Sequence, residues 1–287
     1  MPIHLGLILL LLAAPARGSD DLRVATLLPS AEAAIALIPE SATLVASVRR
    51  QIHTPLPSPL IDLGSPHSPN FEALAQADPQ LVVGDESLHA PLKAQLAGLG
   101  AELFLLDTSS VESTLDSIAR LGRRLQDGGQ LEEAAQNTRA ELVRTALSEP
   151  VEILILFGAP GSFFVVTDRA WIGDLATQLG FVNLAPDGQS ERLPGFVPVN
   201  DEALAILRPE IVVLVAHGAP KAIEEALRER TRAGGAWAGL GQAPLGIHVL
   251  EPALFGANPG LDIASAGDVL VRLASPPSAA PSEPTVP

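Results

Sequence analysis

The chain has 287 residues, of which 47% are hydrophobic, so it is too apolar to be intrinsically disordered and long enough for one large or two medium domains. Its 18 Lys and Arg residues against 33 Asp and Glu residues give a net charge of -15, which repels phosphate and argues against nucleic acid and anionic membranes as partners. Because it has no Cys, no Tyr and only Met1 as methionine, disulfides, thiolate metal sites, a lipid anchor on Cys and a cysteine nucleophile are all excluded.

The first residues have the pattern of a secretory signal. Residues 5–14 form an apolar run that is too short to cross a bilayer as a helix, and Ala-Pro-Ala at residues 14–16 is a small-x-small cleavage pattern. We therefore expect a signal peptide over residues 1–18 and an exported mature protein. At the other end, the proline-rich residues 275–287 predict a disordered tail.

From residue 22 onward, short apolar runs alternate with segments of helical periodicity, which is the pattern of an α/β protein built on parallel sheets. Strands are expected at residues 23–28, 81–84, 103–106, 151–157, 163–166, 211–215 and 247–250. Helices are expected from residue 29 and at residues 91–99, 171–179 and 221–230.

Two consecutive helices interrupt this alternation in the middle of the chain. Ser109 and Glu112 have the spacing of a capping box at the start of a helix over residues 109–126, after which two glycines end it. In residues 130–147, apolar and small residues recur three and four positions apart, which predicts one helix about 27 Å long at about 1.5 Å per residue. A long helix between two strand-rich halves acts as a stiff connector.

A motif in the first half of the chain recurs in the second half. Asn-x-Glu-Ala-Leu, a proline nine residues after the Asn and an apolar strand occur from Asn70 and again from Asn200. Because both copies occupy equivalent places in the two halves, we infer two similar lobes. The expected divisions are a first lobe over residues 22–128, an interlobe helix over 129–149 and a second lobe over 150–274.

Three motifs carry a family resemblance: Ser-Pro-Asn-Phe-Glu from Ser68, Gly-Phe-Val-Pro-Val from Gly195 and Phe-Gly-Ala-Asn-Pro from Phe255. With them, the chain resembles the substrate-binding proteins of ABC importers in the cobalamin, siderophore and heme branch, over residues 22 to about 274. The resemblance implies two Rossmann-like lobes joined by one long backbone helix, the class III architecture. It also implies a periplasmic monomer that binds a ligand and catalyses no reaction.

Two further segments resemble the heme receptors of this branch: Phe-Gly-Ala-Pro-Gly-Ser-Phe from Phe157 leading to Trp171, and Ala-His-Gly around His217. In such receptors a His-Gly segment after a second-lobe strand supplies one axial ligand, and a Met before the Pro-Asn-x-Glu motif supplies the other. The matching positions here are His217 and His67, so His stands where those receptors have Met. The resemblance implies heme as the transported ligand, bound by two imidazoles from opposite lobes.

Other side chains are candidates for the lining of the site. Phe163 and Phe164 are adjacent in an expected strand, so their side chains point to opposite faces and only one of the two is expected to reach the ligand. A heme propionate needs a cation or hydrogen-bond donor, for which Arg169, Arg192 and Lys221 are candidates that no spacing separates.

The remaining histidines invite different interpretations. His89 lies two residues beyond the position that corresponds to His217 in the repeat, so it is a candidate for the lining or for a hydrogen bond that sets the tautomer of a ligand. His53 and His248 have no such placement, and we interpret both as structural. A lone loop histidine is often structural, and this alternative also stands for His67 and His217.

Glu72 and Glu202 occupy matched positions in the two copies of the repeat. In the family that the chain resembles, a glutamate at this position of each lobe docks onto basic residues of the membrane permease, which makes an inner-membrane ABC permease the expected partner. The alternative is structural, because an acidic residue in the first helical turn is stabilised by the helix dipole. The two roles are compatible.

Other ligands and functions remain open from the sequence. Cobalamin or a ferric siderophore is the alternative ligand, although siderophores favour cationic sites and cobalamin favours aromatic walls, and only 3% of this chain is aromatic. A bare zinc or manganese ion needs three or four converging ligands. The chain has no GxxxxGK[ST], GxSxG or HExxH motif, so a two-lobed glycosyltransferase is an enzyme alternative on architecture alone.

Overall fold

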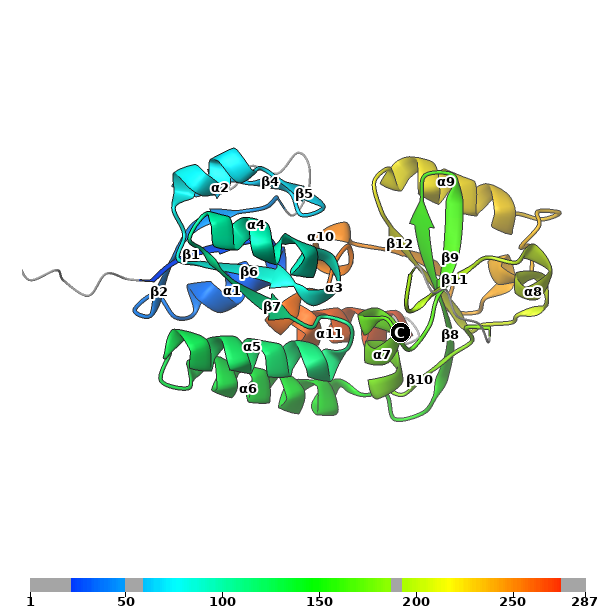
Figure 1. Ribbon diagram of the computed structural model, residues 1–287. Coiled ribbons are helices and arrows are strands. Elements are labelled where there is room, and N and C mark those ends of the chain that lie inside the picture. The colour runs from blue at the N-terminus through cyan, green and yellow to red at the C-terminus, as the bar shows by residue number, and fades with distance from the viewer. Residues whose placement is uncertain (1–21, 50–58, 187–192, 275–287) are drawn as a thin grey trace, which may run out of the picture.

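The computed structural model describes residues 22–49, 59–186 and 193–274, and Figure 1 shows two lobes side by side. The expected signal peptide over residues 1–18, the expected tail over residues 275–287, His53 and Arg192 lie outside these ranges. Within the described ranges, no helix combines the length and apolar character that crossing a membrane requires.

The first lobe is built on a parallel sheet with the strand order β3-β2-β1-β6-β7. Its strands are β1 (Leu22–Thr26), β2 (Ala42–Ser47), β3 (Ile61–Asp62), β6 (Leu81–Asp85) and β7 (Glu102–Leu106). Its connecting helices are α1 (Pro29–Ala36), α2 (Phe71–Ala77), α3 (Glu86–His89) and α4 (Lys93–Gly98). Every residue of β6 is buried, as expected for an apolar run at the centre of a parallel sheet covered on both faces.

A small antiparallel hairpin interrupts this lobe between β3 and α2. Its strands are β4 (Gly64–Ser65) and β5 (Ser68–Pro69), and Pro66 and His67 form the two-residue turn between them. In Figure 1 the hairpin lies on the side of the first lobe that faces the second.

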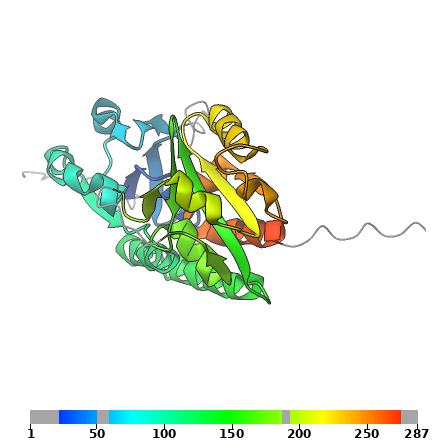
Figure 2. The same ribbon diagram turned by 90° about the vertical axis from the view of Figure 1, so that its right-hand side faces the viewer.

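The second lobe contains a mixed sheet with the order β11-β9-β8-β12-β13, and β10 also pairs with β8. Its strands are β8 (Val151–Ala159), β9 (Ser162–Val166), β10 (Phe181–Asn183), β11 (Phe196–Pro198), β12 (Ile211–Ala216) and β13 (Ile247–Leu250). Its helices are α7 (Trp171–Gln178), α8 (Asp201–Ile206), α9 (Pro220–Thr231), α10 (Pro252–Phe255) and α11 (Ile263–Ala274). Figure 2, with this lobe in front, shows the long green strand β8 beside the yellow strand β12.

Two antiparallel helices, α5 (Val111–Leu125) and α6 (Gln130–Thr145), bridge the lobes. The 16 residues of α6 span about 24 Å at about 1.5 Å per residue. At one end of the pair, Val111 and Leu142 pack in the core of the second lobe, and at the other end Leu125 and Leu131 pack in the core of the first. Because each helix contributes to both cores, the connector is a rigid pair, of which only α6 carries the chain across.

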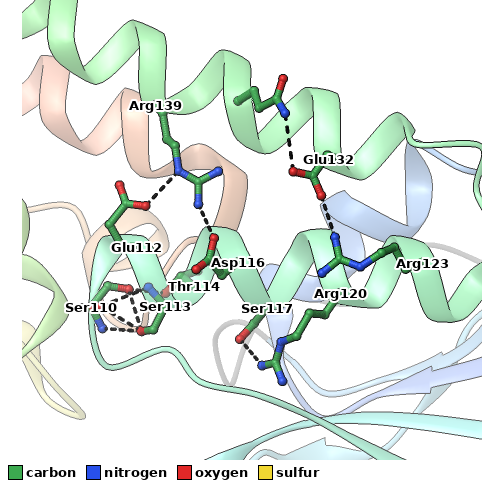
Figure 3. Close-up of polar contacts among 11 residues, drawn as sticks. Ser110, Glu112, Ser113, Thr114, Asp116, Ser117, Arg120, Arg123, Glu132 and Arg139 are labelled. Carbon is green, nitrogen blue, oxygen red and sulfur yellow. Dashed lines mark hydrogen bonds and ion pairs between the residues drawn. The ribbon is translucent and has the colours of Figure 1, made fainter.

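Ion pairs clamp the two connector helices to each other (Figure 3). Arg139 on α6 donates to Glu112 at 2.8 Å and to Asp116 at 2.5 Å, both on α5. The expected capping box is wrong by one residue. The N-cap of α5 is Ser110, whose side chain exchanges hydrogen bonds with Ser113, which leaves Glu112 free to pair with Arg139.

After β13 and α10 the chain returns to the first lobe. Asn258 is buried, and its Nδ2 donates to the carbonyl oxygen of Thr108 at 3.0 Å and to Oγ1 of Thr114 at 2.8 Å. Its Oδ1 accepts a hydrogen bond from the amide of Gly260 at 2.9 Å. One side chain therefore ties the returning segment to the start of α5.

Candidate functional site

His67 is an exposed residue at the tip of the β4–β5 hairpin. Pro66 precedes it in the turn, and its ring fixes the φ angle at that corner. The base of the hairpin is bound to the sheet, because the amide of Leu63 donates to Ser47 O at 2.9 Å and the amide of Asn70 donates to Leu63 O at 2.9 Å. The first lobe thus presents His67 on a short, anchored projection.

His217 directly follows β12, at the carboxyl edge of the second sheet. Its amide donates to Gly158 O at 2.8 Å, which extends the β12–β8 ladder by one residue, while its side chain remains exposed. Ligands of open α/β sheets bind beyond the carboxyl ends of the strands, so His217 occupies the expected place for a ligand contact. Gly218 follows with a φ of +91°, a left-handed conformation that favours glycine.

The structure brings these two histidines together from opposite lobes. The centroids of the His67 and His217 rings are 6.2 Å apart, and the ring planes are at 89° to each other. Within the described residues, no group of three or more His, Asp or Glu side chains is placed to hold a metal ion. Two imidazoles complete the coordination of an iron whose other ligands come from a porphyrin.

An aromatic cluster adjoins His217, and its central member is a residue that we did not single out from the sequence. The ring of Phe157 is stacked on the His217 ring, with centroids 5.8 Å apart and planes at 29°. Phe164 and Phe196 pack against Phe157 with centroid distances of 6.5 Å and 5.2 Å. Phe157 gains this place through the antiparallel register of β8 with β9, which sets it directly opposite Phe164 in the folded sheet.

Of the two adjacent phenylalanines, only Phe164 belongs to this cluster. The alternation of β9 turns Phe163 to the other face of the sheet, so of the two candidates for the lining only Phe164 lies on the side of His217. There its ring packs edge-on against Trp237 at 5.2 Å, and the guanidinium of Arg230 lies 5.7 Å from the Phe163 centroid. Phe163 therefore belongs to the core beneath α9.

His89 does not line the site either, because its side chain is only 1% exposed. The amide of Asp85 donates to its Nδ1 at 2.8 Å, and its Nε2 lies 2.9 Å from Pro66 O. Burial lowers the pKa of the His89 imidazole below its ordinary value of 6.5, against the opposing effects of the Pro66 hydrogen bond and of Asp85. His89 thus lies behind the hairpin that carries His67.

The candidate cations and the remaining histidine are placed as follows. Arg169 is exposed in the turn after β9, and Lys221 is exposed in the first turn of α9, four residues after His217. His248 is on β13 with its Nε2 2.7 Å from Leu245 O, a contact within its own lobe that fits a structural role.

Glu72 and Glu202 occupy matching positions in the two lobes. Each lies in the first turn of its helix, and Asn70 or Asn200 caps that helix by accepting the amides of the second and third residues. Both glutamates are exposed, and neither carboxylate has an ion pair or side-chain hydrogen bond with another described residue. Because the asparagines already accept the amides at the start of each helix, the glutamate side chains are not needed as caps, and both carboxylates are available to a partner.

Comparison with known proteins places this geometry in a family. Residues 35–235 match the family described as periplasmic binding protein. Over 208 residues, which cover 70% of each protein, the chain is 24% identical to the high-affinity heme uptake system protein IsdE of Staphylococcus aureus.

The fold is similar to those of solved substrate-binding proteins. The crystal structure of S. aureus IsdE complexed with heme matches with a TM-score of 0.73 at 21% identity, covering 88% of this chain and 98% of that one. The periplasmic vitamin B12 binding protein BtuF of Vibrio cholerae matches with a TM-score of 0.66 at 18% identity, covering 88% and 97%. These likenesses confirm the predicted architecture of two α/β lobes joined by one long helix.

Proposed function

The chain belongs to the periplasmic binding protein family, and on this premise we propose that it binds heme outside the cytoplasm and delivers it to an ABC importer. His67 and His217 are the proposed axial ligands of the heme iron. The observation that carries the proposal is the approach of these two rings, one from each lobe, to a centroid distance of 6.2 Å. In this role the protein is a carrier without catalytic turnover.

The ring separation fits a shared iron. Imidazole nitrogen binds a transition metal at about 2.0 Å, so two metal–nitrogen bonds of about 2.0 Å and two ring radii of about 1.2 Å give about 6.4 Å between the centroids of two opposed axial imidazoles. The observed separation is 6.2 Å. The perpendicular ring planes are compatible with axial ligation, because rotation about an iron–nitrogen bond leaves the coordination unchanged.

The surroundings of His217 also suit a porphyrin. A macrocycle needs an apolar wall, and Phe157, Phe164 and Phe196 form a half-buried aromatic surface beside the His217 ring. Lys221 and Arg169 are the described candidates for contact with the propionates. The similarity to a heme uptake protein is a further reason to propose heme as the ligand.

The test is a titration of the purified protein with hemin, cyanocobalamin and a ferric hydroxamate. We expect one equivalent of hemin to give a six-coordinate low-spin spectrum, and His67→Ala or His217→Ala to give a five-coordinate high-spin spectrum. His248→Ala is the matched control, because it removes a histidine of the second lobe that contacts Leu245 O. Binding of cobalamin or the ferric chelate without any response to hemin would reject heme in favour of that ligand.

Docking to the permease is the second part of the proposal, and Glu72 and Glu202 are the proposed contacts. Two exposed carboxylates, one per lobe, would report the relative position of the lobes to basic residues of the transporter, and such charges act mainly on orientation and association rate. Charge reversal at both positions should abolish uptake and leave hemin affinity intact. Glu133→Lys is the matched control, since Glu133 is an exposed acid in the first turn of α6. Uptake that survives the double reversal would refute docking through these residues.

Export is the third part of the proposal. Residues 1–18 would act as the signal peptide, and the mature protein would be a periplasmic monomer without a lipid anchor, since the chain has no Cys. N-terminal sequencing of protein recovered from an osmotic-shock fraction tests this directly. A cytoplasmic protein with an intact N-terminus would contradict it.

A further inference from the structure

The hairpin tip that carries His67 is held by a residue from another element of the first lobe. The carbonyl oxygen of Pro66, which belongs to the peptide bond preceding His67, lies 2.9 Å from Nε2 of His89 on α3. The hairpin itself pairs only Gly64 with Pro69 and Ser65 with Ser68, so its own ladder is short. An isolated hairpin of this size is not stable, and its tip depends on outside contacts.

The tautomer of His89 follows from its other hydrogen bond. The amide of Asp85 can only donate, and it lies 2.8 Å from Nδ1, so Nδ1 carries the lone pair. The ring proton is therefore on Nε2, where it is donated to Pro66 O. A second proton on Nδ1 would break the contact with Asp85, so His89 works as a neutral ring with one donor and one acceptor.

The ring of His89 is also fixed by its surroundings. Asp85 is buried and caps α3 through hydrogen bonds from the amides of Ser87 and Leu88, which holds the helix that carries His89. Gly84 leaves the space for the ring, since a Cβ at this position would lie 2.9 Å from Cβ of His89. The His89 ring is therefore held directly behind the hairpin by hydrogen bonds at both of its nitrogens and by close packing against Gly84.

From these contacts we infer that His89 is the positioning residue for His67, and that its Nε2–H···O bond to Pro66 holds the His67 imidazole toward His217. This inference rests on the proposed function, because it assigns His89 a role in axial ligation. His89 does not touch the ligand itself. It acts by fixing the peptide plane from which His67 extends, as a hydrogen bond behind a ligand commonly orients that ligand.

Two substitutions distinguish the hydrogen bond at Nδ1 of His89 from the one at Nε2. Gln places an amide donor near the position of Nε2, and Asn places an amide oxygen near the position of Nδ1. His89→Gln should therefore keep the bond to Pro66, whereas His89→Asn should keep the bond to Asp85 and lose Pro66. His248→Asn is the matched control, because it removes a similar ring-to-carbonyl contact in the second lobe.

The first readout is the ratio of six-coordinate low-spin to five-coordinate high-spin ferric heme at saturating hemin. His89→Asn should lower this ratio by about 2- to 10-fold, the range that one neutral hydrogen bond supplies. His89→Gln should restore it toward the wild-type value, and His248→Asn should leave it unchanged. A wild-type ratio in His89→Asn, or an equal fall in the Gln and Asn variants, would overturn the inference.

The second readout needs no heme, so it separates this inference from the proposed function. Amide hydrogen exchange of residues 64–69 in the ligand-free protein should accelerate in His89→Asn, while exchange in β12 stays at the wild-type rate. Unchanged exchange in the hairpin would overturn the role of His89 even if heme binding is established. Accelerated exchange would support it even if the cargo proves to be another ligand.

Gly84→Ala provides a variant that displaces the His89 ring without removing it. The close approach of the new Cβ to His89 should shift the ring and lower the spin-state ratio in the same direction as His89→Asn. If His89→Asn fails to fold, this variant carries the test. A folded Gly84→Ala protein with wild-type exchange in the hairpin and a wild-type ratio would refute the inference.

Discussion

Replacing Asn258 by Ala should lower the free energy of unfolding by about 2–4 kcal/mol. The side chain makes three hydrogen bonds, of 3.0 Å and 2.8 Å to Thr108 O and Thr114 Oγ1 and of 2.9 Å from the Gly260 amide. Each bond contributes about 1 kcal/mol, and a buried partner left without a bond costs about 1–3 kcal/mol. Thr114 and Gly260 are both buried, so the polar groups that lose Asn258 add this penalty, and the expected total loss is about 2–4 kcal/mol.

Asn200→Ala is the control for this prediction. Asn200 accepts hydrogen bonds from two backbone amides, but it is an exposed helix cap, so its replacement by Ala should lower the free energy of unfolding by only about 1 kcal/mol. The assay is urea unfolding followed by far-UV circular dichroism, with the midpoint and the slope fitted separately. If Asn258→Ala loses no more stability than Asn200→Ala, then the buried tie between the returning segment and α5 does not stabilise the protein as argued.

Three further predictions concern other parts of the fold. Because burial lowers the pKa of His89, the unfolded chain binds a proton on this imidazole below pH 6.5 while the folded protein keeps the ring neutral. The contribution of His89 to the free energy of unfolding is therefore complete above pH 6.5 and falls as the pH drops below it. His89→Gln should flatten this pH dependence in urea titrations from about pH 7 to 5, and an unchanged pH dependence would mean that other groups cause it. Arg139→Ala should lower the free energy of unfolding by about 0.5–1 kcal/mol at low salt and by less at 1 M salt, because its two partners are exposed carboxylates. A loss of stability that salt does not reduce would argue against ion pairing. Asp201→Ala should lower the free energy of unfolding by about 1 kcal/mol and Asp201→Asn by much less, since of the two variants only Asn keeps an acceptor for the Trp237 indole N–H. Equal losses in the two variants would contradict a stabilising role for this hydrogen bond.

The regular parts of the fold were accessible from the sequence because each has a strong local pattern. The apolar run at residues 211–215 became the fully buried β12, and the predicted helix over residues 130–147 became α6. Strand β2 (Ala42–Ser47) was missed, because its apolar run is only three residues long, Leu44 to Ala46, and Thr43 and Ser47 flank it. The cap of α5 was misplaced because Ser109 and Ser110 are adjacent, and which of them faces the helix is decided by the loop before it.

The site was only partly accessible for a different reason. His67 and His217 were found by motif, but Phe157 gains its place beside His217 through the pairing of β8 with β9. The role of His89 depends on Pro66, which is 23 residues away in the chain and joins it only through the folded hairpin. Neither contact leaves a local pattern, so a sequence alone cannot separate a lining side chain from a supporting one.

The low-temperature electron paramagnetic resonance spectrum of the one-to-one ferric heme complex tests the axial pair most directly. The wild-type protein should give a low-spin signal typical of two imidazole ligands, and His67→Ala and His217→Ala should each convert it to a high-spin signal. A high-spin wild-type complex, or a low-spin signal that survives in both single variants, would contradict ligation of one iron by a histidine from each lobe.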